Sequence, residues 1–219
     1  SASTHTVNQA TATASVSSSP NPSKVGQSVT ITATVAAVAP GSGTPSGDVE
    51  FFDGSTSLGT ATLSGGSASI STSSLTLGSH SLTVAYAGDT NFGSTTSSAS
   101  THTVNQASTS TSVASSPNPT VYGQSTTITA TVSVSSPGAG TATGSVTFYD
   151  GTTSLGTATL SGGSASISTA ALSVGSHSLT AVYGGSSDFT GSTSSASTHT
   201  VNQATATASV SSSPNPSKV

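Results

Sequence analysis

An internal repeat of 97 residues limits this chain to folds that close within about a hundred residues. The segment SASTHTVNQA begins at Ser1, again at Ser98 and again at Ser195. Sliding the chain by 97 residues aligns 11–107 with 108–204 without a gap, and 64 of the 97 positions are identical. Self-similarity at a fixed period is the sequence signature of tandem domains. The sequence therefore predicts two copies of one fold.

A longer period lies on top of the first. Residues 195–219 repeat residues 1–25 letter for letter, whereas the corresponding residues 98–122 differ from them after Ala107. We therefore expect an alternating two-domain unit of 194 residues. The same overlap suggests that the chain is a window cut from a long periodic array. Strand exchange with a neighbouring chain is the alternative.

The repeat divides the chain into four parts. We predict complete domains at 11–107 and 108–204. The flanking segments then correspond to single strands, a last strand of a preceding domain at 1–10 and a first strand of a following domain at 205–219.

Each repeat has the alternation of β-strands and no window with helical periodicity. Inward-facing apolar residues recur at every second position in three segments: Val29, Ile31, Ala33 and Val35, with threonines between them, Val49 and Phe51, and Leu82, Val84 and Tyr86. Gly, Pro, Asn and Asp separate these segments. About seven short strands in 97 residues predict an all-β fold, a seven-stranded immunoglobulin-like β-sandwich, repeated in tandem as an extended array.

Three turns refine this prediction. Pro20 and Pro22 interrupt the first strand, and two prolines so close together cannot both lie in a central ladder. The first strand is therefore expected to bend there and cross between sheets. Asp53-Gly54 predicts a hairpin turn, and the SGGS sequence at 64–67 predicts a second hairpin.

The composition excludes several partners. Ser and Thr make up 94 of 219 residues, whereas charged residues make up only 4%. The two lysines, Lys24 and Lys218, and the absence of arginine argue against nucleic acid, which is bound by replacing phosphate counterions with basic side chains. The absence of cysteine excludes disulfides and thiolate metal sites, and no apolar run is long enough for a membrane span.

The ordered motifs of each repeat resemble a known family. They are PNP, VGQ (YGQ in the second repeat), V-x-F-[FY]-D-G, LGTATLSGG, L-x-x-G-x-H and a Gly-rich loop that ends at Phe92 or Phe189. Together they are similar to bacterial Ig-like domains of the group 3 type, which recur in surface proteins and adhesins. The resemblance covers essentially the whole chain. It implies a structural role in stalks and repeat arrays and implies no chemistry.

The histidines are the first candidates for a site. His80 and His177 stand where many sandwiches place a corner tyrosine that hydrogen-bonds back to the loop backbone, and we interpret them as analogues of that corner. His5, His102 and His199 recur one domain apart and are interpreted as tolerated surface groups of the closing strand. Pairing between laterally packed chains is the alternative for these three.

The acidic residues are the second candidates, because carboxylates at domain ends could bind Ca²⁺. In the first repeat they are Asp48, Glu50, Asp53 and Asp89. The second repeat argues against such a site, since three of the four are replaced by Ser145, Thr147 and Ser186. Asx turns are the expected explanation for Asp53, Asp150, Asn91 and Asp188.

The remaining candidates are aromatic and hydroxyl side chains. Phe52, Tyr149 and Tyr122 are expected to point outward, as half-exposed cross-strand neighbours or as sugar-stacking groups. No nucleophile elbow accompanies the many serines. We therefore predict no catalytic, cofactor-binding or metal-binding residue, no cofactor and no enzymatic activity.

Two functions remain. The first is a structural repeat segment of a long extracellular bacterial stalk or fibre, at the cell surface or in a matrix filament. Its partners would be copies of the same repeat, joined end to end and able to associate laterally, and its Ser/Thr surface could carry O-glycans. The alternative is an adhesive module that binds glycan or protein through its loops or outward aromatics. The plain loops APGSGTPSG and SPGAGTATG favour the first function.

Overall fold

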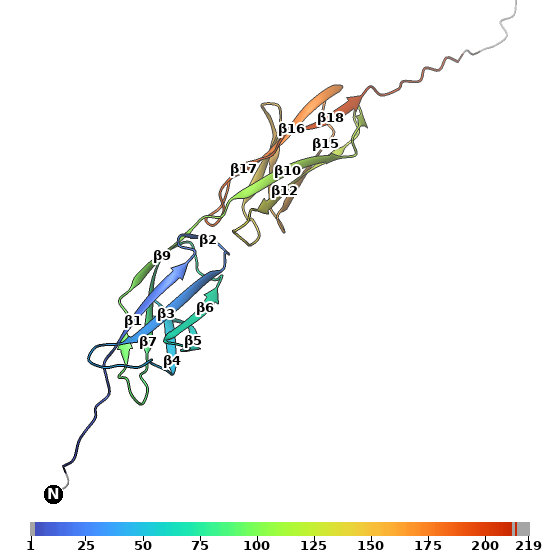
Figure 1. Ribbon diagram of the computed structural model, residues 1–219. Helices are drawn as coiled ribbons and strands as arrows, with labels where there is room; N and C mark the ends of the chain where they lie inside the picture. Colours follow the sequence, from blue (N-terminus) through green and yellow to red (C-terminus); the bar gives the residue numbers. More distant parts are fainter. Residues whose placement is uncertain (1–2, 212, 214–219) are drawn as a thin grey trace, which may run out of the picture. The chain divides into compact units, whose positions relative to one another are not determined.

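The computed structural model describes residues 3–211 and 213, and these residues form eighteen β-strands (Figure 1). They divide into two compact units, and each unit holds one three-stranded and one six-stranded sheet. The predicted all-β fold of tandem sandwiches is confirmed. No helix long and apolar enough to cross a membrane occurs in the described part of the chain. Lys218 and seven of the fifteen residues in the strand predicted at 205–219 lie outside the described residues.

The first unit has seven strands of six to nine residues and two strands of two residues. They are β1 (Ala12–Ser19), β2 (Ser23–Lys24), β3 (Val29–Ala37), β4 (Asp48–Asp53), β5 (Thr56–Thr62), β6 (Ser67–Thr72), β7 (Gly78–Tyr86), β8 (Thr95–Thr96) and β9 (Ser100–Asn105). The seven longer strands match the number that the sequence predicts.

The second unit repeats this order. Its strands are β10 (Thr109–Ser116), β11 (Thr120–Val121), β12 (Thr126–Val134), β13 (Ser145–Asp150), β14 (Thr153–Thr159), β15 (Ser164–Thr169), β16 (Gly175–Tyr183), β17 (Ser192–Thr193) and β18 (Ser197–Asn202).

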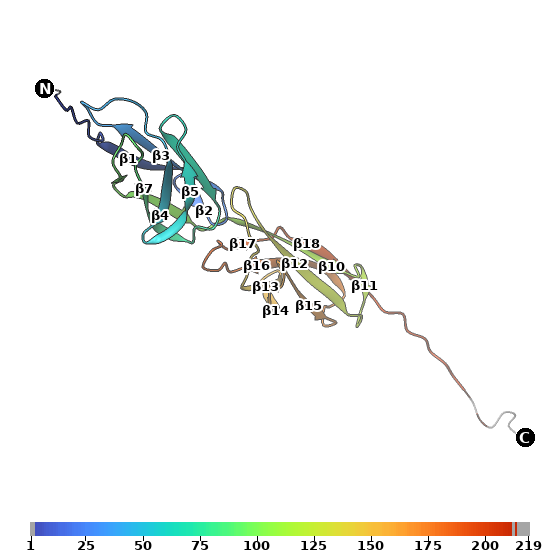
Figure 2. The same ribbon diagram turned by 90° about the horizontal axis from the view of Figure 1, so that it is seen from below.

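The two sheets of the first unit have the orders β1-β3-β6 and β2-β9-β7-β4-β5, and β8 also pairs with β7 (Figures 1 and 2). The pairs are antiparallel except for β2 and β9, which run parallel. The sheets of the second unit have the equivalent orders, β10-β12-β15 and β11-β18-β16-β13-β14. Strands β5 and β6, like β14 and β15, are therefore sheet edges.

The core of the first unit lies between its two sheets. Alternation along β3 buries Ile31 and Val35, and alternation along β4 and β7 buries Phe51, Leu82 and Tyr86 against them. Burial of each such side chain contributes about 1.5–3 kcal/mol. The intervening threonines and serines face outward, so strands with few charges still have one polar face.

The crossover of the first strand is confirmed. β1 pairs with β3 in the three-stranded sheet, from Ala12 opposite Ala37 to Ser19 opposite Thr30. After the two prolines the chain forms β2, which pairs with β9 in the other sheet. One continuous segment thus joins both sheets at the edge of the sandwich.

The second predicted hairpin is wrong in its pairing. The turn itself exists, since Ser64 and Ser67 form an isolated antiparallel bridge. However, β5 pairs with β4 in the six-stranded sheet and β6 pairs with β3 in the three-stranded sheet. Gly66 belongs to the latter, because its carbonyl accepts a hydrogen bond from the Val35 amide. The turn therefore carries the chain from one sheet to the other.

The described segments before β1 and after β18 form no strand. Residues 3–8 have the same sequence, STHTVN, as β9, yet residues 3–9 are unpaired and exposed. Residues 203–211 are likewise without strand structure. A strand needs a partner for its backbone groups, and β9 finds partners on β7 and β2.

Candidate functional site

Each unit contains one cluster of titratable side chains inside the sandwich, which we call the histidine cluster. In the first unit it consists of Ser18, Ser23, Asp53, His80 and His102. In the second unit it consists of Ser115, Thr120, Asp150, His177 and His199. These residues come from β1, β2, β4, β7 and β9 and from their counterparts. The cluster is the main candidate for a functional site.

His80 lies on β7 between two acceptors. Its Nδ1 is 2.7 Å from Asp53 Oδ2, and its Nε2 is 2.8 Å from the Thr76 carbonyl oxygen. The Ser81 amide donates to the other carboxylate oxygen at 3.1 Å. Because a carboxylate and a carbonyl both accept, both ring nitrogens of His80 act as donors when the ring is protonated.

The pKa of His80 responds to this arrangement. Burial lowers it, but the hydrogen bonds to the Thr76 carbonyl and Asp53, together with the charge of Asp53, outweigh burial and raise it above the usual value. The pKa of His177 is raised as well, first by the Ser173 carbonyl and, against the effect of burial, by Asp150. The expected bond from the corner histidine to the loop backbone is confirmed in both repeats.

His102 lies opposite His80 on β9 and is fully buried. Its Nδ1 and Nε2 are each 2.9 Å from a hydroxyl oxygen, of Ser18 and Ser23 respectively. A neutral imidazole has one donor and one acceptor nitrogen, and hydroxyls can serve both. The neutral ring is therefore completely satisfied inside the sandwich.

The pKa of His102 is lowered, first by burial and then by the neighbouring His80, with Asp53 partly offsetting both. The pKa of His199 is lowered by burial and by His177. The two histidines of each cluster therefore differ in the form that their surroundings favour. The protonated form is favoured at His80 and His177, and the neutral form is favoured at His102 and His199.

The interpretation of His102 and His199 as surface groups is wrong. Both are 0% exposed, so neither can pair with a histidine of a neighbouring chain. His5, by contrast, is exposed. The alternation of the closing strand contained the missed signal, because His102 stands two residues before the inward Val104 and therefore shares its face.

The Asx-turn interpretation of Asp53 and Asp150 is also wrong. Their carboxylates accept hydrogen bonds from residues 27 and 28 positions away, on β7 and β16. The carboxylate with Asx-turn geometry is Asp89, which accepts from the amides of Asn91 and Phe92. Asp89 also accepts from the amide and hydroxyl of Ser46, and these bonds hold its pKa well below the usual range.

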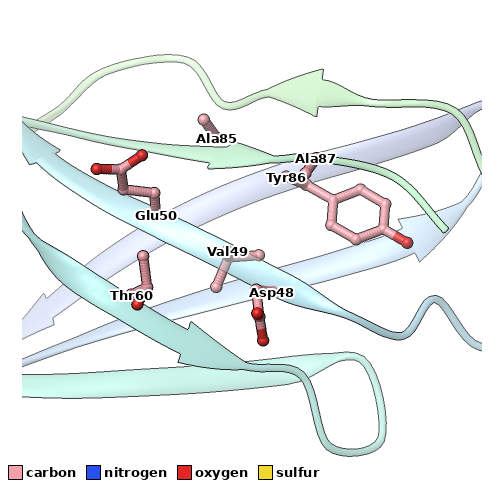
Figure 3. A pocket seen from close by; sticks show the side chains of 7 residues that line it. All are labelled: Asp48, Val49, Glu50, Thr60, Ala85, Tyr86 and Ala87. Atoms are coloured by element: carbon pink, nitrogen blue, oxygen red, sulfur yellow. The ribbon is translucent and has the colours of Figure 1, made fainter.

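The other two acidic candidates lie on the outer face of the first unit. Asp48 accepts from the Thr62 hydroxyl and Glu50 from the Ser57 hydroxyl. They border a shallow hollow of about 220 Å³, to which Thr60 on β5 and Ala85 on β7 also contribute (Figure 3). Among the described residues, no group of three or more His, Asp or Glu is arranged to hold a metal ion.

The aromatic candidates differ in exposure. Phe52 and Tyr149, at equivalent positions on β4 and β13, are half-buried. Tyr122 is 60% exposed, whereas the equivalent residue of the first repeat is Val25, which is partly buried.

The histidine cluster is built for structure rather than for reaction. Asp53 bonds to one histidine and the serines bond to the other, so no single histidine joins an acid to a nucleophile as catalysis by serine requires. Both ring nitrogens of the fully buried His102 are, moreover, already bonded to hydroxyl groups. What the cluster can do is bind five strands together and respond to protons.

Comparison with known families gives one clear result. The family model for the bacterial Ig-like domain (group 3) matches residues 15–105 and again residues 113–202. Each match therefore covers one of the two sandwiches. No curated protein matches the chain.

Solved structures with similar folds include several bacterial surface or modular proteins. Fibronectin(III)-like modules of Clostridium thermocellum CbhA match at 20% identity over 86% of this chain and 95% of theirs, with a TM-score of 0.35. The Yersinia pseudotuberculosis adhesin InvE matches at 17% identity over 83% of this chain, with a TM-score of 0.40. The Escherichia coli adhesin FdeC matches at 16% identity over 86% of this chain, with a TM-score of 0.35. The matches span only 58% of the InvE chain and 63% of the FdeC chain.

Proposed function

This chain belongs to the bacterial Ig-like domain (group 3) family, and we propose that it is a structural repeat segment of a long extracellular bacterial stalk or fibre, without catalytic activity. The observation that carries this proposal is the recurrence of one closed set of internal contacts. Asp53, His80 and His102 find the same kinds of partners as Asp150, His177 and His199, one period later. A titratable cluster that is turned inward in both copies suits a spacer better than an active site.

We further propose that the sandwiches follow one another as a covalent end-to-end array, with domains at 11–107 and 108–204. The spacing of paired residues supports the direct succession of the domains, with the pairing of each sandwich beginning one residue before the boundary that the sequence predicts. Strand β9 ends at Asn105, and Ala107 already pairs with Phe189 of the following repeat, so that one residue separates the two ladders. Ala10 pairs with Phe92 in the same way. In such an array, 1–10 and 205–219 would be strands of the neighbouring domains.

Lateral association between copies is the third part of the proposal. The 17-residue segment TSLGTATLSGGSASIST, which forms the sheet edges β5 and β6, recurs unchanged as β14 and β15. It contains no charged residue and no proline, the usual means by which exposed edges are blocked. The partner that fits best is a second copy of the chain, because it carries the same uncharged edge strands at the same 97-residue spacing.

The array is tested by images of the native full-length protein at the bacterial surface, taken by negative-stain electron microscopy. Single threads or multi-chain filaments whose subunit spacing corresponds to one sandwich are expected. Compact particles without a repeat along their length would contradict the proposal.

Lateral association is tested by placing charge on the edge. Ser69→Lys with Ser166→Lys adds one exposed lysine to β6 and one to β15, and filaments should then separate into thinner threads. Thr13→Lys with Ser110→Lys is the matched control, because it adds the same charge to the opposite edge strands β1 and β10. If the two pairs of lysine substitutions changed filament width equally, lateral association could not be assigned to the edge formed by β5 and β6.

An adhesive module is the second candidate, and the exposure of Tyr122 favours it. An isolated exposed tyrosine can stack on a sugar ring or insert into a protein pocket. Glycan-array binding that is lost in Tyr122→Val, the residue type found at this position in the first repeat, would support adhesion. Absence of binding in the unaltered chain would leave the structural role.

A further inference from the structure

His102 lies where the first strand changes sheets. The Ser18 hydroxyl, near the end of β1, is 2.9 Å from its Nδ1, and the Ser23 hydroxyl, at the start of β2, is 2.9 Å from its Nε2. β1 belongs to the three-stranded sheet and β2 to the six-stranded sheet. One imidazole on β9 therefore holds both sides of the crossover.

The second repeat has the same arrangement with a different hydroxyl residue. His199 is bonded to Ser115 on β10 and to Thr120 on β11, each at 3.0 Å. Thr120, like His199, is buried. The recurrence with either serine or threonine indicates that the hydroxyl group is what the position requires.

A second contact across the crossover does not titrate. The Asn21 side chain donates to the Thr101 carbonyl at 2.9 Å and accepts from the Thr103 amide at 3.1 Å. Asn118 makes the equivalent bonds to Thr198 and Thr200. Of these two contacts across the crossover, only the histidine contact can take up a proton.

The surroundings of His102 disfavour a charged ring. The groups that carry charge on the elements around it are His80 on β7, Lys24 on β2 and, on β4, Asp53 together with Asp48 and Glu50, which lie on the outer face of that strand. The His80 ring is 6.4 Å away between centroids, and Asp53 is already bonded to it. The direct partners of His102 are hydroxyls, and water does not reach it. A second proton would thus place a buried charge beside another histidinium.

The second repeat has the same surroundings without the lysine. His199 faces His177 and, beyond it, Asp150, while Val121 stands where the first repeat has Lys24. A comparison of the two repeats therefore tests whether Lys24 affects the protonation of the buried histidine.

We propose that His102 and His199 are acid-sensitive locks: in the neutral form each ties the first-strand crossover to the last strand, and in the charged form each loosens that crossover before the rest of the sandwich unfolds. The pKa of both residues is lowered, which is the direction that this proposal requires. Stability from a histidine whose folded-state pKa is lowered is present above 6.5 and is lost as the pH falls toward the folded value. The first strand lies at an edge, where local opening is easiest.

The test is amide hydrogen exchange of the intact chain by mass spectrometry at about pH 8 and about pH 5, corrected for intrinsic exchange rates. Between about pH 8 and about pH 5, protection of β1, β2, β10 and β11 should fall more than protection of β3 and β7, because only the first-strand crossover loses its bonds to the buried histidine. A uniform change across all strands, or none, would overturn the proposal.

Variants in the second repeat separate the lock from simple packing, and the unaltered first repeat is an internal control. Thr120→Val keeps the shape but removes the hydroxyl, so β10 and β11 should lose protection at about pH 8 while β1 and β2 do not. Thr120→Ser, which introduces the residue type of the first repeat, should behave as the wild type.

His199→Gln removes the titration. Protection of β10 should then no longer depend on pH, whatever its level, while β1 keeps its dependence. Acid loosening of β10 that persists in His199→Gln would overturn the proposal, and if that variant does not fold, the wild-type and Thr120 measurements decide.

Discussion

At the scale of residues, Asp53 holds His80 from a neighbouring strand. Asp53→Asn removes the charge that His80 faces at 2.7 Å and should cost the first repeat about 1–3 kcal/mol, as for a hydrogen bond to a charged group. Because the pKa of His80 is raised, this contribution is fully present below pH 6.5 and is lost as the pH rises through the folded-state pKa. Urea unfolding of variant and wild type should therefore differ more at about pH 5.5 than at about pH 9.

The control for this measurement is Asp48→Asn. The exposed carboxylate of Asp48 accepts a hydrogen bond from the Thr62 hydroxyl and faces no histidine, so Asp48→Asn should have a small effect on the free energy of unfolding at both pH values. If Asp53→Asn lowered the free energy of unfolding equally at both pH values, a stabilising ion pair between Asp53 and His80 would be contradicted.

Gly88 is a second residue with a specific requirement. Its φ is +90°, and a Cβ there would lie 2.9 Å from the Phe92 carbonyl oxygen and 3.0 Å from the Ser94 amide nitrogen. Gly88→Ala should therefore destabilise the first repeat by about 1–3 kcal/mol in chemical unfolding. Gly54→Asn is the control, since Gly54 has φ +57° with open space around it and asparagine tolerates that conformation. Similar losses in both variants would contradict the steric explanation.

The positions of these residues were only partly predictable. The alternation of apolar residues predicts that Val29 and Phe51 face inward, because their burial follows the local periodicity of the strand. The direction of His102 follows the same rule, but its burial depends on two hydroxyls that are 79 and 84 residues away in sequence. No local pattern reveals such partners.

At the scale of elements, the loop between β7 and β8 is organised by Asp89 in the first repeat alone. Asp89→Ser, which introduces the residue of the second repeat, removes the acceptor for Ser46, Asn91 and Phe92 and should lower the thermal unfolding midpoint of the first repeat. The lowered pKa of Asp89 means that its contribution is present above 3.8 and is lost as the pH falls.

Calorimetry should thus show a clear difference between Asp89→Ser and the wild type at about pH 7 and a smaller one at about pH 2. Glu50→Gln is a suitable control, because the Glu50 carboxylate accepts a hydrogen bond from the Ser57 hydroxyl on the neighbouring strand and does not organise a loop. A difference that stays constant over this pH range would show that the loop does not depend on the carboxylate.

The pairing of elements was less predictable than their existence. The turn at Ser64 and Ser67 has the glycines of a tight hairpin, with φ of +62° and +79°, and local chemistry predicts it correctly. Which sheet each flanking strand joins is set by long-range pairs such as Ile31 with Ile70 and Val49 with Ala61. The crossover at Pro20 was predictable because proline excludes one ladder outright.

At the scale of the whole molecule, scarcity of charge is the dominant property. The ion pairs in the described part of the chain are Asp53 with His80 and Asp150 with His177, and both disappear when the histidines are neutral. At about pH 9 the thermal unfolding midpoint should therefore change little between about 0.05 and about 0.5 M NaCl, whereas at about pH 5.5 salt should screen the two pairs and lower it slightly. A large salt effect at the higher pH would point to electrostatic contacts that the sandwiches do not contain.

The parallel pairing of β2 with β9 has a mechanical consequence. The chain enters each sandwich through β1 and β2 and leaves it through β9, and Ser23 and Lys24 lie beside Val104 and Asn105. A pull on the two ends of the sandwich draws these strands in opposite directions along their length, so their hydrogen bonds are loaded together in shear rather than opened one by one. Resistance to forced unfolding depends on the unfolding rate, not on equilibrium stability. A tether made of such sandwiches would bear part of its tension through the short seam between β2 and β9.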